Sequence, residues 1–412
     1  MSTLTQLIQR NRHEGVRRFY IKRRLIDGSY EADWQRMDNY RNLTRVTDWG
    51  SVSIEIDEQP GLIGSFNVSE LSLIVDNQDG AFNVETYSNS FWWDDATYLN
   101  RRYSKIKIET AYVDDDGSEV GEADTFEGYI DAVLLAEDYT ATLICFSYQA
   151  VFQRYPIADL SLTGSKTVTQ IIDLITNQSK ITDFMPHVAA SAGYNFTITD
   201  TSTLEGTYWD VLTELAFKSN SILFLSGSTF KFQQRTPGSV VWNFKGSGSD
   251  DPDDIYYIND YDDEGIGKVR VYWKAEGLAL TAISSDATLL LKYLSEPEIV
   301  NLDFADSGDR QTILNTLRNK WETPRPTIEF ETKFLINEVD ILDKITLEVR
   351  GNLNPPLGSG SFKWDAWTWD DGSIWGEELG GIIISSGTEW VVTMIIKDFE
   401  NWKMIIRAER VV

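Results

Sequence analysis

Residues 68–75 read VSELSLIV and are followed at once by DNQDG, residues 76–80. Alternation of apolar and polar residues is typical of a strand with one buried face, and an acidic segment that ends in glycine is typical of a tight turn. The same combination occurs at SVSIEI (51–56) and again near the end of the chain, where WVVTMIIK (390–397) and WKMIIRAE (402–409) flank DFEN. The pattern predicts antiparallel sheets in both outer thirds of the chain.

The middle of the chain changes its periodicity. Residues 167–180 and 207–220 carry apolar residues every three or four positions, which predicts two amphipathic helices, with short strand-like segments between and after them. A similar pattern predicts a helix over 309–321, which Pro324 and Pro326 would end, and a short helix is expected over residues 1–12.

Together these segments predict a mainly β protein with α+β elements. We expect two antiparallel β-barrel-like or sandwich-like domains flanking a small α/β module. The first β domain covers residues 1–155, the module covers 156–240, and the second β domain covers 241–412, with one helix and a tryptophan-rich loop. A length of 412 residues is enough for two to four domains with their own cores.

Composition narrows the classes of function. Sixty-four acidic residues against thirty-seven basic ones leave a net charge of −27, so the surface as a whole repels nucleic acid and anionic membranes. We expect neither a signal peptide in the first twelve residues nor a membrane-spanning segment. The single cysteine, Cys145, lies in a strand pattern and is expected to be a buried thiol in a protein that folds in a reducing cytoplasm.

One basic segment departs from the acidic trend. It contains Arg10, Arg12, Arg17, Arg18, Lys22, Arg23 and Arg24. It falls on the first predicted helix and strand, so we expect these side chains to pair with an acidic neighbouring subunit in preference to DNA. Arg17, Arg18, Arg23 and Arg24 are therefore candidate interface residues.

Residues suited to catalysis or metal binding are scarce. The two histidines, His13 and His187, are expected to be ordinary surface residues, and no nucleophile elbow, phosphate-binding loop or zinc motif is present. Asp260-x-Asp262-x-Glu264 begins like an EF-hand loop, but its twelfth position is Val271, which excludes that site. The acidic run at 250–254 leaves two alternatives, a solvated loop or a weak calcium site. We predict no catalytic residue, cofactor or resident metal.

Tryptophan is concentrated in two loops. Trp92 and Trp93 lie in the first, and Trp364, Trp367, Trp369 and Trp375 lie in the second, residues 362–376. Tryptophan on a loop marks a protein interface or a covered core edge more often than a ligand site, so these six residues are candidate interface residues. The alternative is contact with sugars, in which carboxylates such as Asp365, Asp370 and Asp371 could take part.

The order of the segments resembles that of the tail-hub, or baseplate-hub, proteins of tailed bacteriophages. The segment 68–82 is similar to the family's strand followed by Asp-Asn-x-Asp-Gly, and 126–131 is similar to its x-Gly-x-Ile strand. Residues 207–216 with the strands at 223–225 and 230–232 resemble the helix and hairpin of its middle module. Residues 339–347 with the closing hairpin resemble its final β domain. The similarity covers most of the chain, but the segments around Trp92 and residues 364–375 have no match in the pattern.

This resemblance implies a non-enzymatic structural protein of the virion tail, made and assembled in the host cytoplasm. Such hubs are homotrimers in which two β domains per subunit form a six-domain ring between the tail tube and the tip. The implied partners are further copies of the chain and tail-tube, distal-tail, tip or fibre proteins, while DNA would pass an acidic lumen without sticking. The alternative function is a carbohydrate-binding or depolymerising tail protein that acts through the loop 362–376.

Overall fold

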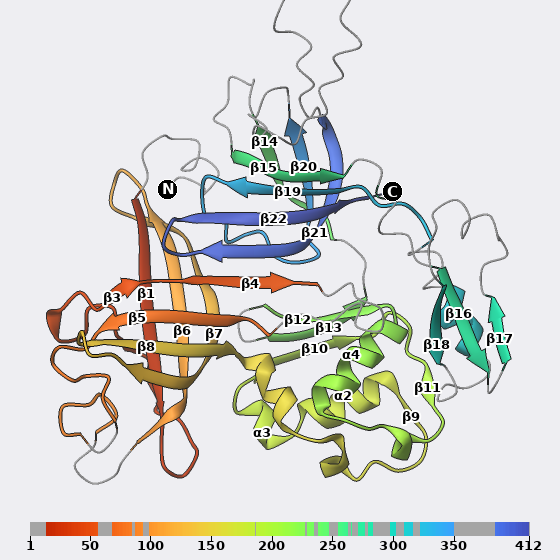
Figure 1. Cartoon of the computed structure of the whole chain (residues 1–412), viewed down its shortest axis with the longest axis horizontal. Helices are drawn as coiled ribbons and strands as arrows, with labels where there is room; N and C mark the ends of the chain where they lie inside the picture. The colour runs from red at the N-terminus through yellow and green to blue at the C-terminus, as the bar shows by residue number, and fades with distance from the viewer. Residues whose placement is uncertain are drawn as a thin grey trace, which may run out of the picture.

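The structure is a computed structural model, and it confirms the mainly β fold class (Figure 1). It describes residues 14–56, 68–84, 87–93, 99–185, 187–226, 229–234, 238–246, 254–262, 265, 271–276, 279–282, 297–301, 309–315, 322–349 and 384–411. The predicted helix over residues 1–12 lies outside these residues. The domain boundaries given above stay predictions.

The first part of the chain forms a seven-stranded sheet, here called the N-terminal sheet, with strand order β2-β1-β6-β7-β8-β5-β3. All of its pairings are antiparallel. Its strands are β1 (Glu14–Arg24), β2 (Gln35–Arg36), β3 (Val46–Asp48), β5 (Glu70–Asp76), β6 (Asn100–Val113), β7 (Glu119–Leu135) and β8 (Thr140–Ser147). Alternating burial along β5 and β8 confirms that period-two patterning marks half-buried strands here.

The small module begins with the 3-10 helix η2 (Tyr148–Arg154) and contains the two helices that the sequence predicts. Helices α2 (Val168–Thr176) and α4 (Tyr208–Lys218) each begin with a capping box, from Thr167 and Gln170 and from Thr207 and Asp210. A capping box satisfies backbone N–H groups at the start of a helix, which explains why both helices begin where they do. They lie beside the strands β10 (His187–Ser191), β13 (Thr229–Gln234) and β12 (Ser221–Ser226), and the module also has α3 (Ser179–Thr182), β9 (Lys166–Thr167) and β11 (Thr197–Ile198).

The last part of the chain forms a second large sheet, the C-terminal sheet. Its order is β14-β20-β21-β22-β19-β15, built from β14 (Val240–Gly246), β15 (Ile255–Asp262), β19 (Thr327–Thr332), β20 (Lys344–Val349), β21 (Ile384–Asp398) and β22 (Lys403–Arg410). The terminal hairpin β21–β22 is as predicted. The sheet is mixed and not purely antiparallel, because β14 and β20 run parallel. Strand β4 (Ser51–Glu55) leaves the N-terminal region and pairs with β21.

Three further strands form a separate small sheet in the order β17-β16-β18, with β16 (Val271–Glu276), β17 (Ala279–Ala282) and β18 (Pro297–Asn301). Residues 309–315 are helical, which agrees with the first half of the helix predicted over 309–321; its second half lies outside the described residues. Ile313 and Leu314 of this helix are fully buried in the core of the small module.

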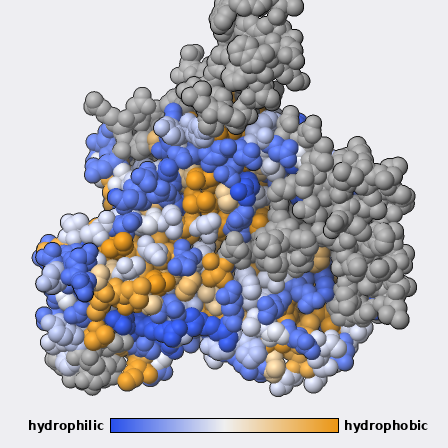
Figure 2. All heavy atoms as spheres, in the orientation of Figure 1, coloured by the Kyte–Doolittle hydropathy of each residue, from blue (hydrophilic) through white to orange (hydrophobic). Residues whose placement is uncertain are grey.

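Two apolar cores hold the molecule together. One extends continuously through both large sheets, and the other fills the small module. The first core includes Val52 of β4, Leu73 of β5 and Ile395 of β21, so strand β4 lies where the two sheets meet. Figure 2 shows apolar side chains gathered on the visible face over the region of β5 and β8 in Figure 1.

Candidate functional site

The basic residues of β1 make contacts within the chain itself. Arg17 reaches the C-terminal sheet, where its guanidinium donates to the carbonyl of Phe399 and lies 3.7 Å from the Glu400 carboxylate. It also stacks on Trp49 and Trp402, with its guanidinium carbon 5.0 and 5.6 Å from the ring centroids. Arg17 therefore joins the two large sheets of the chain.

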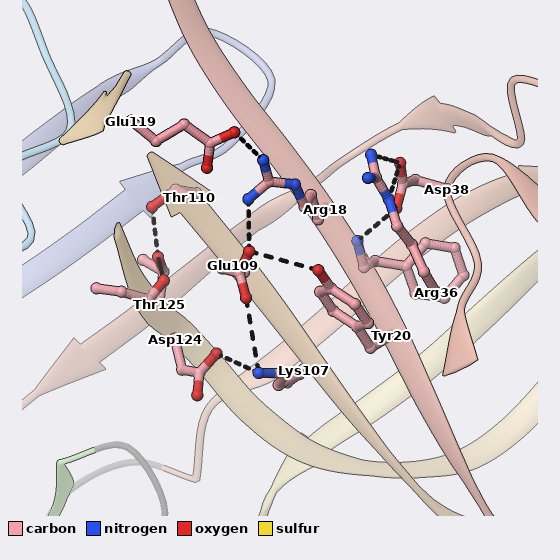
Figure 3. Close-up of polar contacts among 12 residues, drawn as sticks. Arg18, Tyr20, Arg36, Asp38, Lys107, Glu109, Thr110, Glu119, Asp124 and Thr125 are labelled. Carbon is pink, nitrogen blue, oxygen red and sulfur yellow. Dashed lines mark hydrogen bonds and ion pairs between the residues drawn. The ribbon is translucent and has the colours of Figure 1, made fainter. Parts of the chain in front are cut away.

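Arg18 belongs to a polar network on the face of β1, β6 and β7 (Figure 3). Its guanidinium donates to Glu109 at 2.7 Å and to Glu119. Lys107 continues the network, with its Nζ 3.7 Å from Glu109 and 2.8 Å from Asp124. Two cations and three carboxylates thus pair across three adjacent strands, so both cations are neutralised within the sheet and one negative charge is left over.

Arg23 and Arg24 have different kinds of partner. Arg23 donates through two nitrogens to the carboxylate of Glu31 and stacks on Phe91, with its guanidinium carbon 4.8 Å from the ring centroid. Arg24 instead donates to the carbonyl of Gly28 and stacks on Tyr103. Within the described part of the chain, Arg17, Arg18 and Arg23 thus have carboxylate partners.

Of the six candidate tryptophans, the structure describes Trp92 and Trp93. Trp92 is fully buried, and its indole N–H donates to the hydroxyl of Ser104 at 3.0 Å. It is therefore a core residue and not an interface residue. Trp93 beside it is half-buried. The remaining four, Trp364, Trp367, Trp369 and Trp375, lie outside the described residues, as does the rest of the loop 362–376.

The contact between the two large sheets is polar as well as apolar. The hydroxyl of Tyr112 on β6 donates to the carbonyl of Leu335 at 2.8 Å and accepts from the N–H of the same residue at 2.9 Å. Asn337 donates to the Thr110 hydroxyl and to the carbonyl of Gly121, both at 3.0 Å. These directional bonds fix the orientation of one sheet on the other, which a scaffold needs.

A small cleft opens where β4, β7 and the small module meet. Its lining includes Val52, Ile54, Phe126, Glu127 and Leu225, and it holds roughly 50 Å³. That volume admits a few water molecules and excludes a sugar or nucleotide. Burial and, to a smaller extent, the nearby Asp124 raise the pKa of Glu127 to about 7, against the opposite effect of two lysines of β6.

Glu127 gives a pH prediction. Its carboxyl binds a proton more tightly in the folded chain than its ordinary pKa of about 4.5 allows, so its charge opposes folding above pH 7 and this penalty fades as the pH falls toward 4.5. We expect Glu127→Gln to raise the free energy of unfolding at pH 8 by about 1–2 kcal/mol, after allowance for partial exposure, and to have no effect near pH 4.5. Urea denaturation at both pH values measures this, with Glu137→Gln as the control, because Glu137 is also exposed and lies outside the β6–β7 hairpin. A stabilisation that is equal at both pH values contradicts it.

Residues considered for catalysis or metal binding do not come together in the described part of the chain. No group of three or more His, Cys, Asp or Glu side chains there is arranged to hold a metal ion. Cys145 is fully buried, as predicted, and burial raises the pKa of its thiol. His13, Glu264, Asp250, Asp251 and Asp253 lie outside the described residues. Among the residues that are described, no helix is both long and apolar enough to span a membrane.

Comparison with known proteins gives a match at the level of structure. No family model and no curated protein matches the sequence. The structure is similar to the tail protein from Neisseria meningitidis MC58, with a TM-score of 0.51 and 11% identity over 95% of this chain and 96% of that one. It is also similar to the 43 kDa tail protein of prophage MuSo2 from Shewanella oneidensis, with a TM-score of 0.50 and 10% identity over 95% and 96% of the two chains. The chain therefore shares its fold, over nearly its whole length, with solved structures of tail proteins.

Proposed function

We propose that the protein is a structural component of a phage tail, namely a distal-tail or baseplate hub. The observation that carries the proposal is the likeness of fold to two tail proteins, which extends over 95% of this chain. A match of that extent includes both large sheets and the module between them, so it concerns the whole architecture and not one common motif. The proposed role is a non-enzymatic one.

The proposed assembly is a homotrimeric ring that continues the tail tube, anchors tip or fibre proteins and lets DNA pass. Two features support it. One face of β5, β7 and β8 carries Ile74 and Ile144 half-exposed, with Leu134 54% exposed, and an apolar patch of this kind favours a protein partner. The charge of −27 supports an acidic bore, because such a wall would repel the phosphate backbone and keep DNA from binding.

The mass of the full chain in solution tests this proposal. At micromolar concentration, sedimentation or light scattering is expected to give three times the 46.9 kDa of one chain. A monomer at every concentration up to tens of micromolar contradicts the trimer. A glycan array with wild type and Trp367→Ala tests the role separately: saccharide binding that the substitution abolishes would favour a carbohydrate-binding tail protein instead.

A further inference from the structure

The pairing of β1 with β6 is interrupted near the start of β6. Lys22 pairs with Lys105, but Arg24 pairs with Asn100, so the four residues 101–104 of β6 face the single residue Arg23 of β1. Such a bulge bends the strand and changes the direction in which its side chains point, and bulges are frequent at functional positions.

The bulge is held rigidly from inside. Ser104 is fully buried, and its hydroxyl accepts from the indole N–H of Trp92 at 3.0 Å and donates to the carbonyl of Asn100 at 3.0 Å. Tyr103 next to it has a φ of +68°, a left-handed conformation that is costly for a bulky residue. The hydroxyl of Tyr30 donates to the Tyr103 carbonyl at 2.9 Å and holds it there. Strained backbone conformations that neighbouring residues hold in place are common at binding and active sites.

The bulge presents Tyr103 to three arginines, and we call these four residues with Asp131 the Tyr103 cluster. The guanidinium carbons of Arg24, Arg102 and Arg154 lie 5.4, 5.1 and 4.9 Å from the centre of the Tyr103 ring. Asp131 is the carboxylate among them, with its Oδ1 3.0 Å from Arg102 and 2.8 Å from Arg154. Arg102 and Arg154 thus share one carboxylate, so the described residues of the cluster carry three cations and one anion. The side chain of Arg102 is 54% exposed. The cluster is positive, preorganised and accessible.

A carboxylate-bearing protein surface fits this cluster best. Guanidinium groups bind carboxylates through paired hydrogen bonds, and stacking on a ring fixes the guanidinium plane before the partner arrives. A chain with a net charge of −27 repels its own copies, so self-association needs cations at the contact. The strong negative charge of the chain also disfavours nucleic acid as the partner.

The hairpin between β6 and β7 offers the matching surface. Residues 108–153 contain neither lysine nor arginine, and the hairpin within them carries Asp114, Asp115, Asp116, Glu119 and Glu122. Asp115, Asp116 and Glu122 are exposed. The cluster lies at the start of β6 and the hairpin at its end, so the two surfaces occupy opposite ends of the N-terminal sheet (Figure 1).

We propose that the Tyr103 cluster of one subunit binds the acidic β6–β7 hairpin of a second copy of this chain. Because the two surfaces differ and lie at opposite ends of the sheet, the contact is head-to-tail, and three copies related by a threefold rotation would close a ring through it. This inference rests on the proposed trimer and names the contact that holds it together.

Charge reversal at the exposed arginine tests the contact. In sedimentation experiments on the full chain, Arg102→Glu is expected to weaken trimer formation at least tenfold, whereas Arg102→Lys keeps the charge and most of the affinity. Arg36→Glu is the matched control, because Arg36 is also an exposed arginine of the N-terminal sheet, paired with Asp38. An unchanged trimer in Arg102→Glu overturns the contact and leaves the proposed function standing, whereas a monomeric wild type overturns both.

Rescue identifies the partner surface. Asp116→Arg with Glu122→Arg is expected to weaken the wild-type trimer, and the same pair combined with Arg102→Glu is expected to restore it, because the opposite charges then face each other again. Weakening by Arg102→Glu without rescue overturns the assignment to the hairpin. Oligonucleotide binding that Arg102→Glu abolishes while the trimer persists would assign the cluster to nucleic acid instead. Circular dichroism and the melting temperature of each variant show that its subunits are folded.

Discussion

Replacing Arg45 with methionine is expected to lower the free energy of unfolding by about 3–5 kcal/mol, because it leaves a carboxylate without its buried partner. Arg45 is fully buried and donates to both oxygens of Asp79, at 2.8 and 2.7 Å, and to the carbonyl of Tyr40 at 3.0 Å. The Arg45 guanidinium holds the pKa of Asp79 well below its usual range, against the effect of burial. The pair ties the loop before β3 to the acidic turn after β5.

Arg41 provides a matched control, since it donates to the same carboxylate at 2.8 Å from a side chain that is 40% exposed. We expect Arg41→Met to cost about 0–1 kcal/mol. Urea denaturation, compared through the midpoint and the slope, gives both values. Because Asp79 stabilises the fold only while it is charged, the difference between the variants should shrink as the pH falls below about 4. Equal losses of unfolding free energy in the two variants would show that the burial of Arg45 does not determine the size of the loss.

Trp92→Ala is the second substitution with a large expected effect, a loss of about 3–5 kcal/mol of unfolding free energy. The ring is fully buried and packs edge-on against Phe91 and Phe82, with centroids 5.4 and 6.2 Å apart. Removing it leaves a large cavity behind the β6 bulge and deprives Ser104 of its indole donor.

Trp92→Phe separates the two contributions, because it removes the hydrogen bond but keeps most of the apolar packing, at an expected cost of about 1–2 kcal/mol. Thermal and urea unfolding of both variants measure the loss. If Trp92→Ala kept wild-type stability but lost self-association, the residue would belong to an interface, as its sequence context alone suggests, and its burial in the subunit core would be contradicted.

The mainly β character and the two module helices could be predicted because their signals are local. Strand β5 shows the expected alternation of burial, and α2 and α4 begin at capping residues that the sequence displays. One local signal extends too far: the residues at 339–349 carry a strand-like pattern throughout, but β20 begins only at Lys344. Asp340 and Asp343 close a turn before it, with the N–H of Asp340 donating to the Asp343 carboxylate at 2.7 Å. Short-range side-chain bonds of this kind compete with strand formation.

Features that depend on distant parts of the chain could not be predicted. Strand β4 pairs with β21, as at Ile54 and Ile395, and nothing in either segment encodes that partner. The sequence shows that β1 is rich in arginine, but it does not show which carboxylates pair with these side chains. Glu109 and Glu31 become their partners only in the folded chain. The grouping of Arg102 with Arg154 could not be predicted either, because about fifty residues separate them in the sequence. The bulge in β6 places the Tyr103 ring against both side chains.

A cryo-electron microscopy reconstruction of the full chain, purified at micromolar concentration, tests the central claim most directly. The account predicts a closed threefold ring in which six large sheets surround a bore lined by carboxylates, with the β6 bulge of each subunit against an acidic hairpin of the next. A single subunit without symmetry, or a ring whose bore is lined by lysine and arginine, would contradict it.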